Sequence, residues 1–491
     1  ILIEKSKIHD VEVTELGKLT ESGYVHLTYE GKTVALININ KLFNTEPRKE
    51  MKAAWTGGAT QQKIITSDYS LEDSLCLVMS QPDVASKEWF FRQKDSSVKG
   101  GTIQGPLIGL EQEVEADATI QKPLDTEGKD FGAIAYALGI APKVSDLDHY
   151  HAVQKSFLDM VGKIIAIGGK LPDMEHAGWD AWGVCGNYCQ PNSEGNSTLV
   201  KENGEYNLAS LIREGIGVRE VIEKLNIPII SGKDSMKCSC VYQVEDSFSL
   251  DDVPADLRKH ITLAEKEVTE IDELTGAEVK VMKPHIEIHD PETYLVSGAV
   301  KIEDYRKCVS SSFKMDGDLV YVIGSTENQL GASQYLQAIG YKEQGRPLDG
   351  GTIPAVDLDE FVEVADKVHH VIDRELVASC SYIHNGGLAV ALTKAALAGK
   401  KGAVIDLNKI WRTTGYSSTE NLLYSETPGR FVVTIDPQDQ SEFEQTLGSV
   451  HYARVGRVTE KDLRILRPEC KLETIDLEKV KQAYQEPLRF E

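Results

Sequence analysis

The chain has 491 residues, a formal net charge of −24 at pH 7, and 41% hydrophobic and 26% charged residues, which is ordinary for a globular protein. A negative field of this size repels nucleic-acid phosphates and anionic lipids, so we expect neither a nucleic acid nor a membrane surface as a partner. The sequence shows no apolar run of transmembrane length, no signal peptide and no disulfide framework among its eight cysteines, and we therefore expect a cytoplasmic protein.

A short repeat relates the two ends of the chain. Residues 15–27 (ELGKLTESGYVHL) and 454–466 (RVGRVTEKDLRIL) both place a glycine between apolar residues ahead of a Thr-Glu pair. In each copy an alternating strand and a second strand, ending near Asn38 or Asp476, follow, which predicts strand–turn–strand. A chance similarity between two hairpins is the alternative. If the repeat is real, the chain begins in the tail of one module and ends in the tail of its duplicate, and a first residue other than Met agrees with this.

Between these tails the pattern predicts two domains. In the first, strands are expected at 114–121, 163–169 and 226–232, and helices at 151–165 and 206–225. The elements mix without a strict strand–helix alternation, which favours an α+β fold. Residues 241–284 are acidic and weakly patterned, as in an insertion or a flexible excursion.

The second predicted domain covers residues 315–466. Strands at 317–325 and 430–435 alternate with helices at 365–376 and 388–399. This alternation predicts helices packed on a sheet.

The strongest local motif is NIPIISGKDSM (226–236), in which an apolar strand is expected to end at Ile230. Gly232 would let the backbone approach a phosphate, while Lys233 supplies a charge and Ser235 a hydroxyl. Asp234 could accept a hydrogen bond from a substrate hydroxyl or hold a cation. On chemistry alone, an ordinary surface turn explains the motif equally well.

Several segments, in chain order, resemble the second half of the phosphoribosylformylglycinamidine synthases. The matching segments are DVASKEWFF (83–91), EADAT (115–119), CGNYC (185–189), GKDSM (232–236), GDLVYVIG (317–324), LGAS (330–333), HNGGLAVAL (384–392) and YSETPGRFVV (424–433). The resemblance implies tandem domains related to AIR synthase: the tail of a preceding copy at 1–55, an N-terminal domain with a ferredoxin-like sheet at 56–305, and a C-terminal α/β domain at 306–491.

The resemblance also implies an activity, which is ATP-dependent conversion of formylglycinamide ribonucleotide and ammonia to the amidine through an iminophosphate. ATP and Mg²⁺ are the implied cofactors. The first half of the synthetase and a glutaminase that delivers ammonia are the implied partners. The family's catalytic histidine run is not found in this sequence, so we expect no catalytic residue in this half and no activity without the other.

The resemblance also implies which residues of this sequence occupy the family's binding sites. Gly232 and Lys233 match an ATP site, and Asp234 and Ser235 a substrate site. An auxiliary nucleotide site would use the following residues: Ala116, Asp117, Asp159, Lys163 and His384. Asp117 and Asp159 would be its metal ligands.

Three positions depart from the family pattern. Lys163 and Tyr382 stand where the auxiliary site has Asn and Asp, and Gly186 stands where some members have Asp. Loss of two oxygen ligands should weaken Mg²⁺ binding. A non-catalytic nucleotide-binding half that partners a catalytic subunit is therefore the main alternative function.

Other candidate sites have simpler interpretations. A zinc scaffold would need Cys185, Cys189, Cys238 and Cys240, whose spacing is unlike that of zinc knuckles. His149 and His151 are expected to be a capping or surface pair rather than ligands. Gly386 and Gly387 could receive a phosphate at a helix start, or could simply form a tight turn.

Overall fold

The computed structural model describes residues 2–8, 10–44, 50–57, 68–123, 130–172, 181–191, 193, 204–236, 238–258, 260–272, 275–348, 351–414 and 418–490. The chain divides into two compact units, Ile1–Lys52 and Ala53–Glu491. The expected boundary at residue 55 lies close to this division.

The first unit is a small hairpin with flanking helices. It contains α1 (Leu2–Ile8), the antiparallel strands β1 (Tyr24–Tyr29) and β2 (Lys32–Asn38), and α2 (Ile39–Asn44). The displacement that relates 15–27 to 454–466 also relates β1, β2 and α2 to β19 (Leu463–Leu466), β20 (Leu472–Ile475) and α15 (Leu477–Gln485), respectively.

The predicted strand–turn–strand is present in each copy: β1 and β2 form one hairpin that ends at Asn38, and β19 and β20 form the other, which ends at Ile475 beside the expected Asp476. Residues 11–20, which precede the first hairpin, form no strand. In the second copy, β18 (Tyr452–Thr459) and β19 do not pair with each other, because both pair with β16 (Gly402–Asp406) between them.

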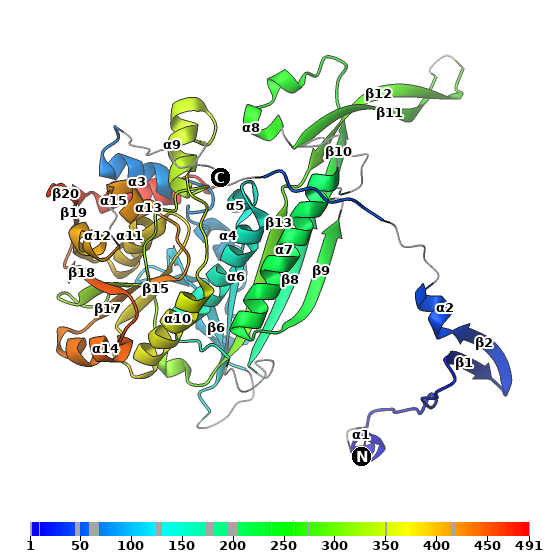
Figure 1. Ribbon diagram of the computed structural model, residues 1–491, viewed down its shortest axis with the longest axis horizontal. Helices are drawn as coiled ribbons and strands as arrows, with labels where there is room; N and C mark the ends of the chain where they lie inside the picture. Colours follow the sequence, from blue (N-terminus) through cyan, green and yellow to red (C-terminus); the bar gives the residue numbers. More distant parts are fainter. Residues whose placement is uncertain are drawn as a thin grey trace. The chain divides into compact units, whose positions relative to one another are not determined.

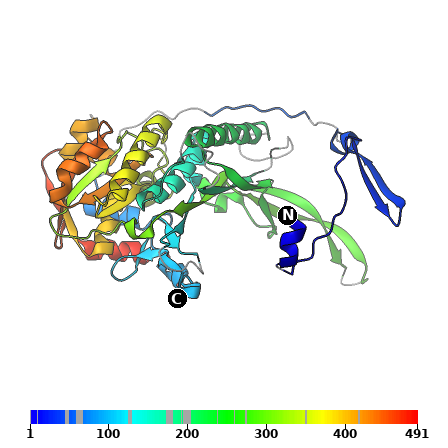
Figure 2. The same ribbon diagram turned by 90° about the horizontal axis from the view of Figure 1, so that it is seen from below.

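The larger unit contains a six-stranded sheet in the order β3-β6-β7-β13-β8-β9. Its strands are β3 (Thr102–Gln104), β6 (Thr119–Gln121), β7 (Ala133–Gly139), β13 (Thr293–Ile302), β8 (Trp182–Gln190) and β9 (Ile229–Met236). The edge pair β8–β9 is parallel and is connected through helix α7 (Gly204–Leu225). Helices α6 (His149–Ala166) and α7 lie together on one face of this sheet (Figures 1 and 2).

Two predicted strands of this domain have a different structure. The apolar run 163–169 completes α6 and the turn after it, because its side chains continue the buried face of the helix. Residues 114–121 form two short strands, β5 (Val114–Glu115) and β6, and β5 pairs with β4 (Leu107–Ile108) outside the main sheet.

The predicted insertion or flexible excursion at 241–284 contains regular structure, because three described strands between residues 239 and 289 form a separate sheet. Its order is β10 (Ser239–Gln243), β12 (Glu278–His289) and β11 (Ile261–Ile271), and both pairs are antiparallel. The ribbon of β11 and β12 projects away from the helices (Figure 1). Both faces of the ribbon carry exposed charged residues, so its strands lack the clean alternation that a half-buried strand shows.

The C-terminal part is built on a seven-stranded sheet in the order β15-β17-β14-β18-β16-β19-β20. Its remaining strands are β14 (Leu319–Ile323), β15 (Ser379–Ile383) and β17 (Arg430–Ile435). Among its described pairs only β16–β19 is parallel, so the sheet is mostly antiparallel. The described helices not yet named are α3 (Leu71–Met79), α4 (Glu88–Arg92), α5 (Pro142–Ser145), α8 (Ala255–Arg258), α9 (Gln334–Gln344), α10 (Leu358–Asp373), α11 (Gly387–Gly399), α12 (Leu407–Thr414), α13 (Thr419–Tyr424) and α14 (Gln440–Leu447).

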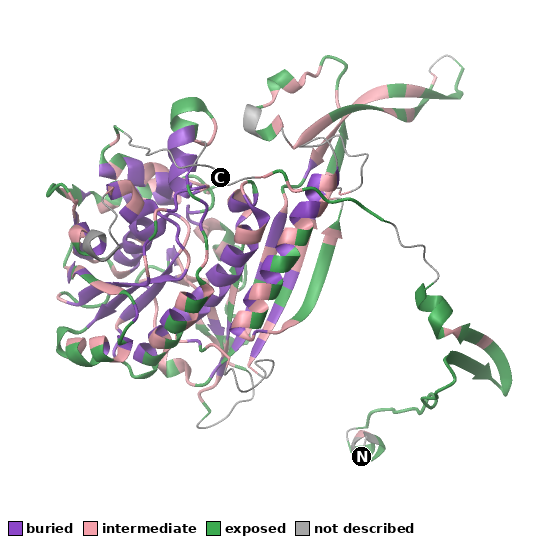
Figure 3. Cartoon of the chain, viewed as in Figure 1, coloured by how far each residue is buried: buried purple, intermediate pink, exposed green. Residues whose placement is uncertain are grey.

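Two large buried clusters hold these layers together (Figure 3). One joins the six-stranded sheet and α6 to α10 and to one face of the seven-stranded sheet. The other fills the opposite face of that sheet beneath α3, α9, α11 and α15. The predicted α+β class is confirmed. In the parts of the chain that the structure describes, no helix has the length and apolar character needed to cross a bilayer.

Candidate functional site

The GKDS motif lies within a strand and not in a loop after it. Strand β9 continues to Met236 and pairs with β8, which places Gly232 opposite Gly186 and Ser235 opposite Cys189. The predicted strand end at Ile230 was therefore wrong. The motif instead forms the exposed edge of the six-stranded sheet (Figure 3).

Strand alternation divides the motif between the two faces of the sheet. Ser235 Oγ donates to Asn187 Oδ1 over 3.4 Å, so Ser235 and Lys233 lie on the face opposite α6 and α7, which we call the outer face. Asp234 points to the helix side, where burial first, and nearby charges that include Asp234 to a lesser degree, raise the pKa values of Tyr188 and Tyr294. Gly232 and Asp234 therefore alternate with Lys233 and Ser235 between the two faces, whereas the resemblance implies an ATP site at Gly232 and Lys233 and a substrate site at Asp234 and Ser235.

The glycines at this edge play different roles. A Cβ on Gly232 would meet only Gly186 O at 3.5 Å, an ordinary contact, so the fold does not require glycine there. A Cβ on Gly186 would lie 2.0 Å from the Tyr294 hydroxyl oxygen. The departure from Asp at position 186 therefore has a steric reason, because a side chain would collide with the buried Tyr294.

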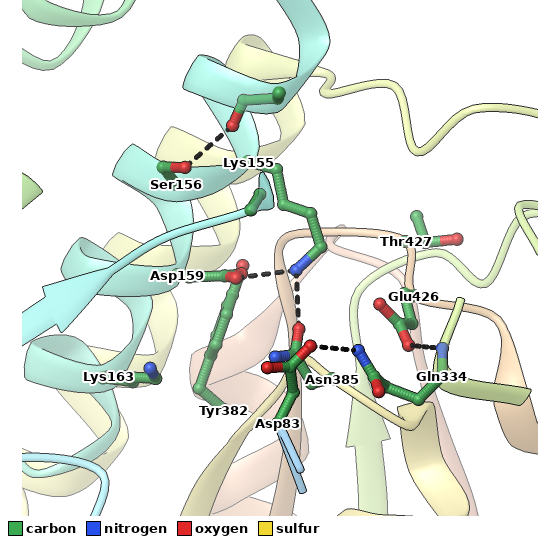
Figure 4. A network of polar contacts seen from close by, with 12 residues as sticks. Asp83, Lys155, Ser156, Asp159, Lys163, Gln334, Tyr382, Asn385, Glu426 and Thr427 are labelled. Atoms are coloured by element: carbon green, nitrogen blue, oxygen red, sulfur yellow. Dashed lines mark hydrogen bonds and ion pairs between the residues drawn. The ribbon is translucent and has the colours of Figure 1, made fainter. Parts of the chain in front are cut away.

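Two auxiliary-site residues, Asp159 and Lys163, lie on one side of α6 together with Lys155, and we call these three residues the α6 stripe. Lys155, Asp159 and Lys163 follow one another at four-residue spacing, which places them on one side. Lys155 Nζ lies 2.6 Å from Asp159 Oδ2, and the two side chains are 1% and 4% exposed. Lys155 Nζ also donates to Asn385 Oδ1 over 3.3 Å (Figure 4). Lys155 and Asp159 are therefore a buried ion pair within α6, and the hydrogen bond to Asn385 connects this pair to the segment just before α11.

Asp117 and Tyr382 belong to other elements and lie next to the lysines and Asp159 of α6. The backbone N–H of Tyr382, on β15, donates to Asp117 Oδ1 over 3.2 Å. Burial raises the pKa of Asp117 to about 6, although this hydrogen bond and the charge of Lys163 oppose the shift. The Tyr382 ring lies against Gly162, where a Cβ would approach it to 2.2 Å. Ala116 precedes Asp117 and packs against the second buried cluster.

Two further lysines, which sequence reasoning missed, surround the same place. Lys394 Nζ on α11 lies 2.8 Å from Glu115 Oε2. The backbone N–H of Lys87 donates to the other oxygen, Glu115 Oε1, over 2.7 Å. Burial and then the charge of Lys394 lower the pKa of Lys87 to about 8. Burial, followed by the charges of Lys163, Lys394, Lys155 and Lys87, holds the pKa of His384 well below its usual value. Four lysines therefore act electrostatically on one histidine.

The donor set of this site does not fit a resident Mg²⁺. A hard divalent cation needs several oxygen ligands, whereas Asp159 already binds an ammonium and Asp117 accepts from a backbone N–H. The charge of Lys163, one helical turn from Asp159, repels a cation. Across the described ranges, no group of three His, Cys, Asp or Glu side chains is arranged to hold a metal ion.

Two other expectations from the sequence are decided by geometry. Gly386 starts α11 with φ of 79°, and its N–H donates to Glu426 Oε1 over 2.8 Å. The Gly386–Gly387 segment is therefore a tight turn whose first N–H is already used. His149 and His151, expected to be a capping or surface pair, lie in the first turn of α6, but His149 is 1% exposed and contacts the Glu292 carboxylate, so the surface alternative was wrong for it.

The cysteines considered for zinc lie at the same edge as GKDS. Cys185 and Cys240 are exposed, and Cys189 and Cys238 are half-buried free thiols. Cys238 Sγ donates to Ser235 O over 3.0 Å. We expect protein purified without chelator to contain substoichiometric zinc, and a stoichiometric zinc whose removal unfolds the chain would contradict this.

A buried acid near the end of β8 also escaped sequence reasoning. Glu214 on α7 is fully buried and accepts from Gln190 Nε2 over 2.6 Å. Burial raises the pKa of Glu214 to about 9, and the charge of Glu292 adds to the shift. A lone Glu in an amphipathic helix gives no sequence signal of such burial.

Known proteins resemble this chain over most of its length. The family model described as AIR synthase related protein, C-terminal domain, matches residues 315–467. The phosphoribosylformylglycinamidine synthase subunit PurL of Thermococcus sibiricus is 24% identical over 97% of this chain and 54% of its own length. The same subunit from Thermoanaerobacter pseudethanolicus is also 24% identical, over 100% and 57%. The chain thus spans about half the length of the curated relatives it matches.

Solved structures support the same fold. Thermotoga maritima PurL complexed with FGAR has a TM-score of 0.54 at 12% identity, covering 85% of this chain and 55% of that one. A crystal structure of phosphoribosylformylglycinamidine synthase II from the same organism has a TM-score of 0.52 at 12% identity, covering 85% and 53%. The resemblance stated from the sequence and the AIR synthase-like fold are confirmed.

Proposed function

We propose that this chain, which resembles the second half of phosphoribosylformylglycinamidine synthases, supplies one wall of the active cleft in an ATP-dependent amidine-forming ligase. The reaction converts formylglycinamide ribonucleotide and ammonia to formylglycinamidine ribonucleotide in purine biosynthesis. The observation that carries the proposal is the position of Lys233 and Ser235 on the uncovered face of a sheet, in a chain that aligns with PurL over its whole length.

The chemistry divides into two displacements. The amide oxygen of the substrate attacks the γ-phosphorus of ATP, ADP leaves, and an iminophosphate forms. Ammonia then attacks the imidate carbon, and inorganic phosphate leaves with the oxygen as the amidine forms. Phosphorylation converts a poor leaving oxygen into a good one, and positive charge at the phosphates stabilises both transition states.

Lys233 and Ser235 are the groups of this chain that we assign to that cleft. An exposed ammonium suits a phosphate of ATP, and a neighbouring hydroxyl suits the phosphoribosyl substrate. Asp234 is left out of this assignment because it points to the other face. Mg²⁺ would supply further positive charge, but the α6 stripe does not fit it, and we assign no Mg²⁺ ligand in this chain.

The outer face also supports the proposed partner. Tyr136, Leu138 and Ile230 are 41%, 53% and 64% exposed on this uncovered sheet face. A related module with its own uncovered sheet would bury these side chains and complete the cleft. Free ammonia is scarce at neutral pH, so a glutaminase subunit or domain would deliver it, in a cytoplasmic assembly.

The decisive experiment is reconstitution. We would express this chain alone and measure ADP release with formylglycinamide ribonucleotide, ATP and ammonium, then add the first half of the synthetase in trans. We expect no turnover by the chain alone and turnover by the pair. Comparable turnover by the isolated chain would show that it is self-sufficient and would contradict the proposal.

A second candidate function is a non-catalytic half that only supports a catalytic partner. The departures at Lys163 and Tyr382 favour it, because they change a site expected to hold a nucleotide. The two functions differ at Lys233: a supporting half should give the reconstituted pair full activity after Lys233→Ala, whereas a cleft wall should not.

A further inference from the structure

Two half-buried thiols lie beside Ser235 at the edge of the six-stranded sheet. Cys189 on β8 is the cross-strand partner of Ser235 on β9. Cys238 Sγ donates to Ser235 O over 3.0 Å, and the backbone N–H of Cys238 donates to Gln190 O over 3.0 Å. Cys238 therefore extends the pairing with β8 just beyond the end of β9, and both cysteines are immediate neighbours of Ser235.

The side chain of Asn187 connects Cys189 to Ser235 on the outer face. Asn187 Nδ2 donates to Cys189 Sγ over 3.4 Å, and Asn187 Oδ1 accepts from Ser235 Oγ over 3.4 Å. Burial and then the charge of Asp290 raise the pKa of Cys238, and the charge of Cys189 adds to this shift, so the two thiols interact. Paired strands lie about 4.8 Å apart and a disulfide joins Cα atoms roughly 4.4–6.8 Å apart, so a bond between neighbouring positions fits the sheet.

We propose that Cys189 and Cys238 form a reversible disulfide when the chain meets a peroxide. Reversible, redox-sensing disulfides are the kind found in reducing compartments, whereas permanent structural ones belong to oxidising compartments. Hydrogen peroxide is small enough to reach both thiols, because both are half-buried and not enclosed. Exposure alone would favour the exposed thiols Cys185 and Cys240, so the proposed pair is distinguished by the closeness of its two members.

The chemistry needs two displacements at sulfur. The Cys189 thiolate attacks one oxygen of hydrogen peroxide, the O–O bond breaks, and the departing hydroxide takes up the proton that the thiol had lost, which leaves a sulfenic acid and water. The Cys238 sulfur then attacks the Cys189 sulfur, the S–O bond breaks, and the second hydroxide leaves as water with the Cys238 proton. Two thiols are oxidised and one peroxide is reduced. Cys238 acts second because Ser235 O holds its proton and its raised pKa keeps that proton in place.

The disulfide would change the surroundings of Ser235. Once bonded to Cys189, the Cys238 sulfur has no proton to donate to Ser235 O, and the Cys189 sulfur must move relative to Asn187. Asn187 also accepts from Ser235, so two contacts that hold Ser235 change together. Because Ser235 is assigned to the substrate cleft, oxidation should reduce turnover, and this regulatory effect rests on the proposed function.

The test begins with the full chain, which is treated with hydrogen peroxide and digested with trypsin without a reducing agent. We expect mass spectrometry to find a cross-link that joins the peptide containing Cys189 to the peptide containing Cys238, and we expect dithiothreitol to remove it. Cys189→Ser and Cys238→Ser should each abolish this cross-link. Alanine at either position provides a second variant if the serine variant does not fold.

Matched controls lie on the same segments. Cys185 lies on β8 with Cys189, Cys240 lies on β10 close to Cys238, and both controls are exposed. Cys185→Ser and Cys240→Ser should leave the cross-link in place. These variants also assign the bond, because trypsin leaves Cys185 in one peptide with Cys189, and Cys240 in one peptide with Cys238.

Turnover of the reconstituted synthetase then tests the regulatory effect. This chain is oxidised and freed of peroxide before the first half is added. The oxidised synthetase should be about tenfold slower than the reduced one, since misplacing a substrate-contacting group by about 1 Å can lower a rate by that much or more. Dithiothreitol should restore the rate, and the Cys238→Ser synthetase should keep its rate through the same treatment.

Two results would overturn the proposal, namely absence of the cross-link from the oxidised chain and a cross-link that persists in the Cys189→Ser or Cys238→Ser variant. A fully cross-linked chain that supports the reduced rate would overturn the regulatory effect. A reduced synthetase without turnover would instead contradict the proposed function, and the cross-link would still decide whether the two thiols form a pair.

Discussion

The two faces of the six-stranded sheet differ in the environment of their ionisable side chains. On the side covered by α6 and α7, Lys155 and Asp159 are buried as a pair, and Glu214 is buried beside Gln190. On the outer side, Lys233 is exposed with no pairing carboxylate among the described residues. Of these buried groups, Lys155 and Asp159 pair with each other, and burial keeps Glu214 neutral. Charge on the outer side remains available to a ligand or a second module.

Removing one member of the buried pair should have the largest effect. Lys155→Met leaves Asp159 buried without its cation, and we expect the free energy of unfolding to fall by about 3–5 kcal/mol, measured by urea denaturation. The double variant Lys155→Met/Asp159→Leu should recover most of this loss. A single variant within about 1 kcal/mol of the parent would show that the pair is not buried as described.

On the outer side the same kind of substitution should affect turnover and not stability. Lys233→Ala in the reconstituted synthetase should lower the rate tenfold or more, because a charged hydrogen bond to phosphate is worth about 1.5–3 kcal/mol. Ser235→Ala should also lower the rate by tenfold or more. Lys280→Ala, an exposed lysine on the β11–β12 ribbon, is the control. Normal steady-state rates in the Lys233 and Ser235 variants would remove both residues from the cleft.

The covered side should also make stability depend on pH through Glu214. Its pKa is raised to about 9, so between the unfolded value near 4.5 and about 9 the folded chain holds a proton that the unfolded chain has lost. Stability from this group is therefore greatest at low pH and is lost as pH rises toward 9, by up to about 1.4 kcal/mol per pH unit. Glu214→Gln keeps a hydrogen-bond acceptor for Gln190 and should remove that slope in denaturation between pH 6 and 8. An unchanged slope would mean that Glu214 is ionised.

A substitution on the outer face should change stability least of all and should instead weaken association with the other half. Tyr136→Glu should alter the free energy of unfolding by no more than about 0.5 kcal/mol, yet weaken association with the first half by tenfold or more. Tyr341→Glu on α9 is a matched control, since both tyrosines are 41% exposed. Equal association of the two variants would place the partner elsewhere.

Much of the fold could be predicted because its periodic segments are long. The expected helices at 151–165 and 206–225 lie within α6 and α7, and the strand at 430–435 coincides with β17. The run at 163–169 failed because a short apolar segment cannot by itself distinguish a strand from the end of a buried helix. The ribbon at 239–289 was missed since neither of its faces is consistently apolar.

The candidate sites were harder to predict, for a different reason. Periodicity alone places Lys155, Asp159 and Lys163 on one side of a helix. Their convergence with Lys87 and Lys394 depends on tertiary contacts across more than two hundred residues, which no local pattern encodes. The face on which Lys233 lies depends on whether GKDS is a strand or a loop, and the sequence did not decide that.

The order of strands in the six-stranded sheet affects how this unit can fold. Strand β13 (Thr293–Ile302) is its last strand in the chain, yet it lies between β7 and β8 and pairs with both. During synthesis, β7 and β8 therefore lack the strand that pairs with both until residue 302 has emerged. Until then their unpaired edges can pair incorrectly. Such long-range closure slows folding, and shortening the intervening ribbon would relieve it only slightly, because each halving of a loop saves about 0.6 kcal/mol. We therefore expect a growing chain to depend on chaperones until β13 inserts.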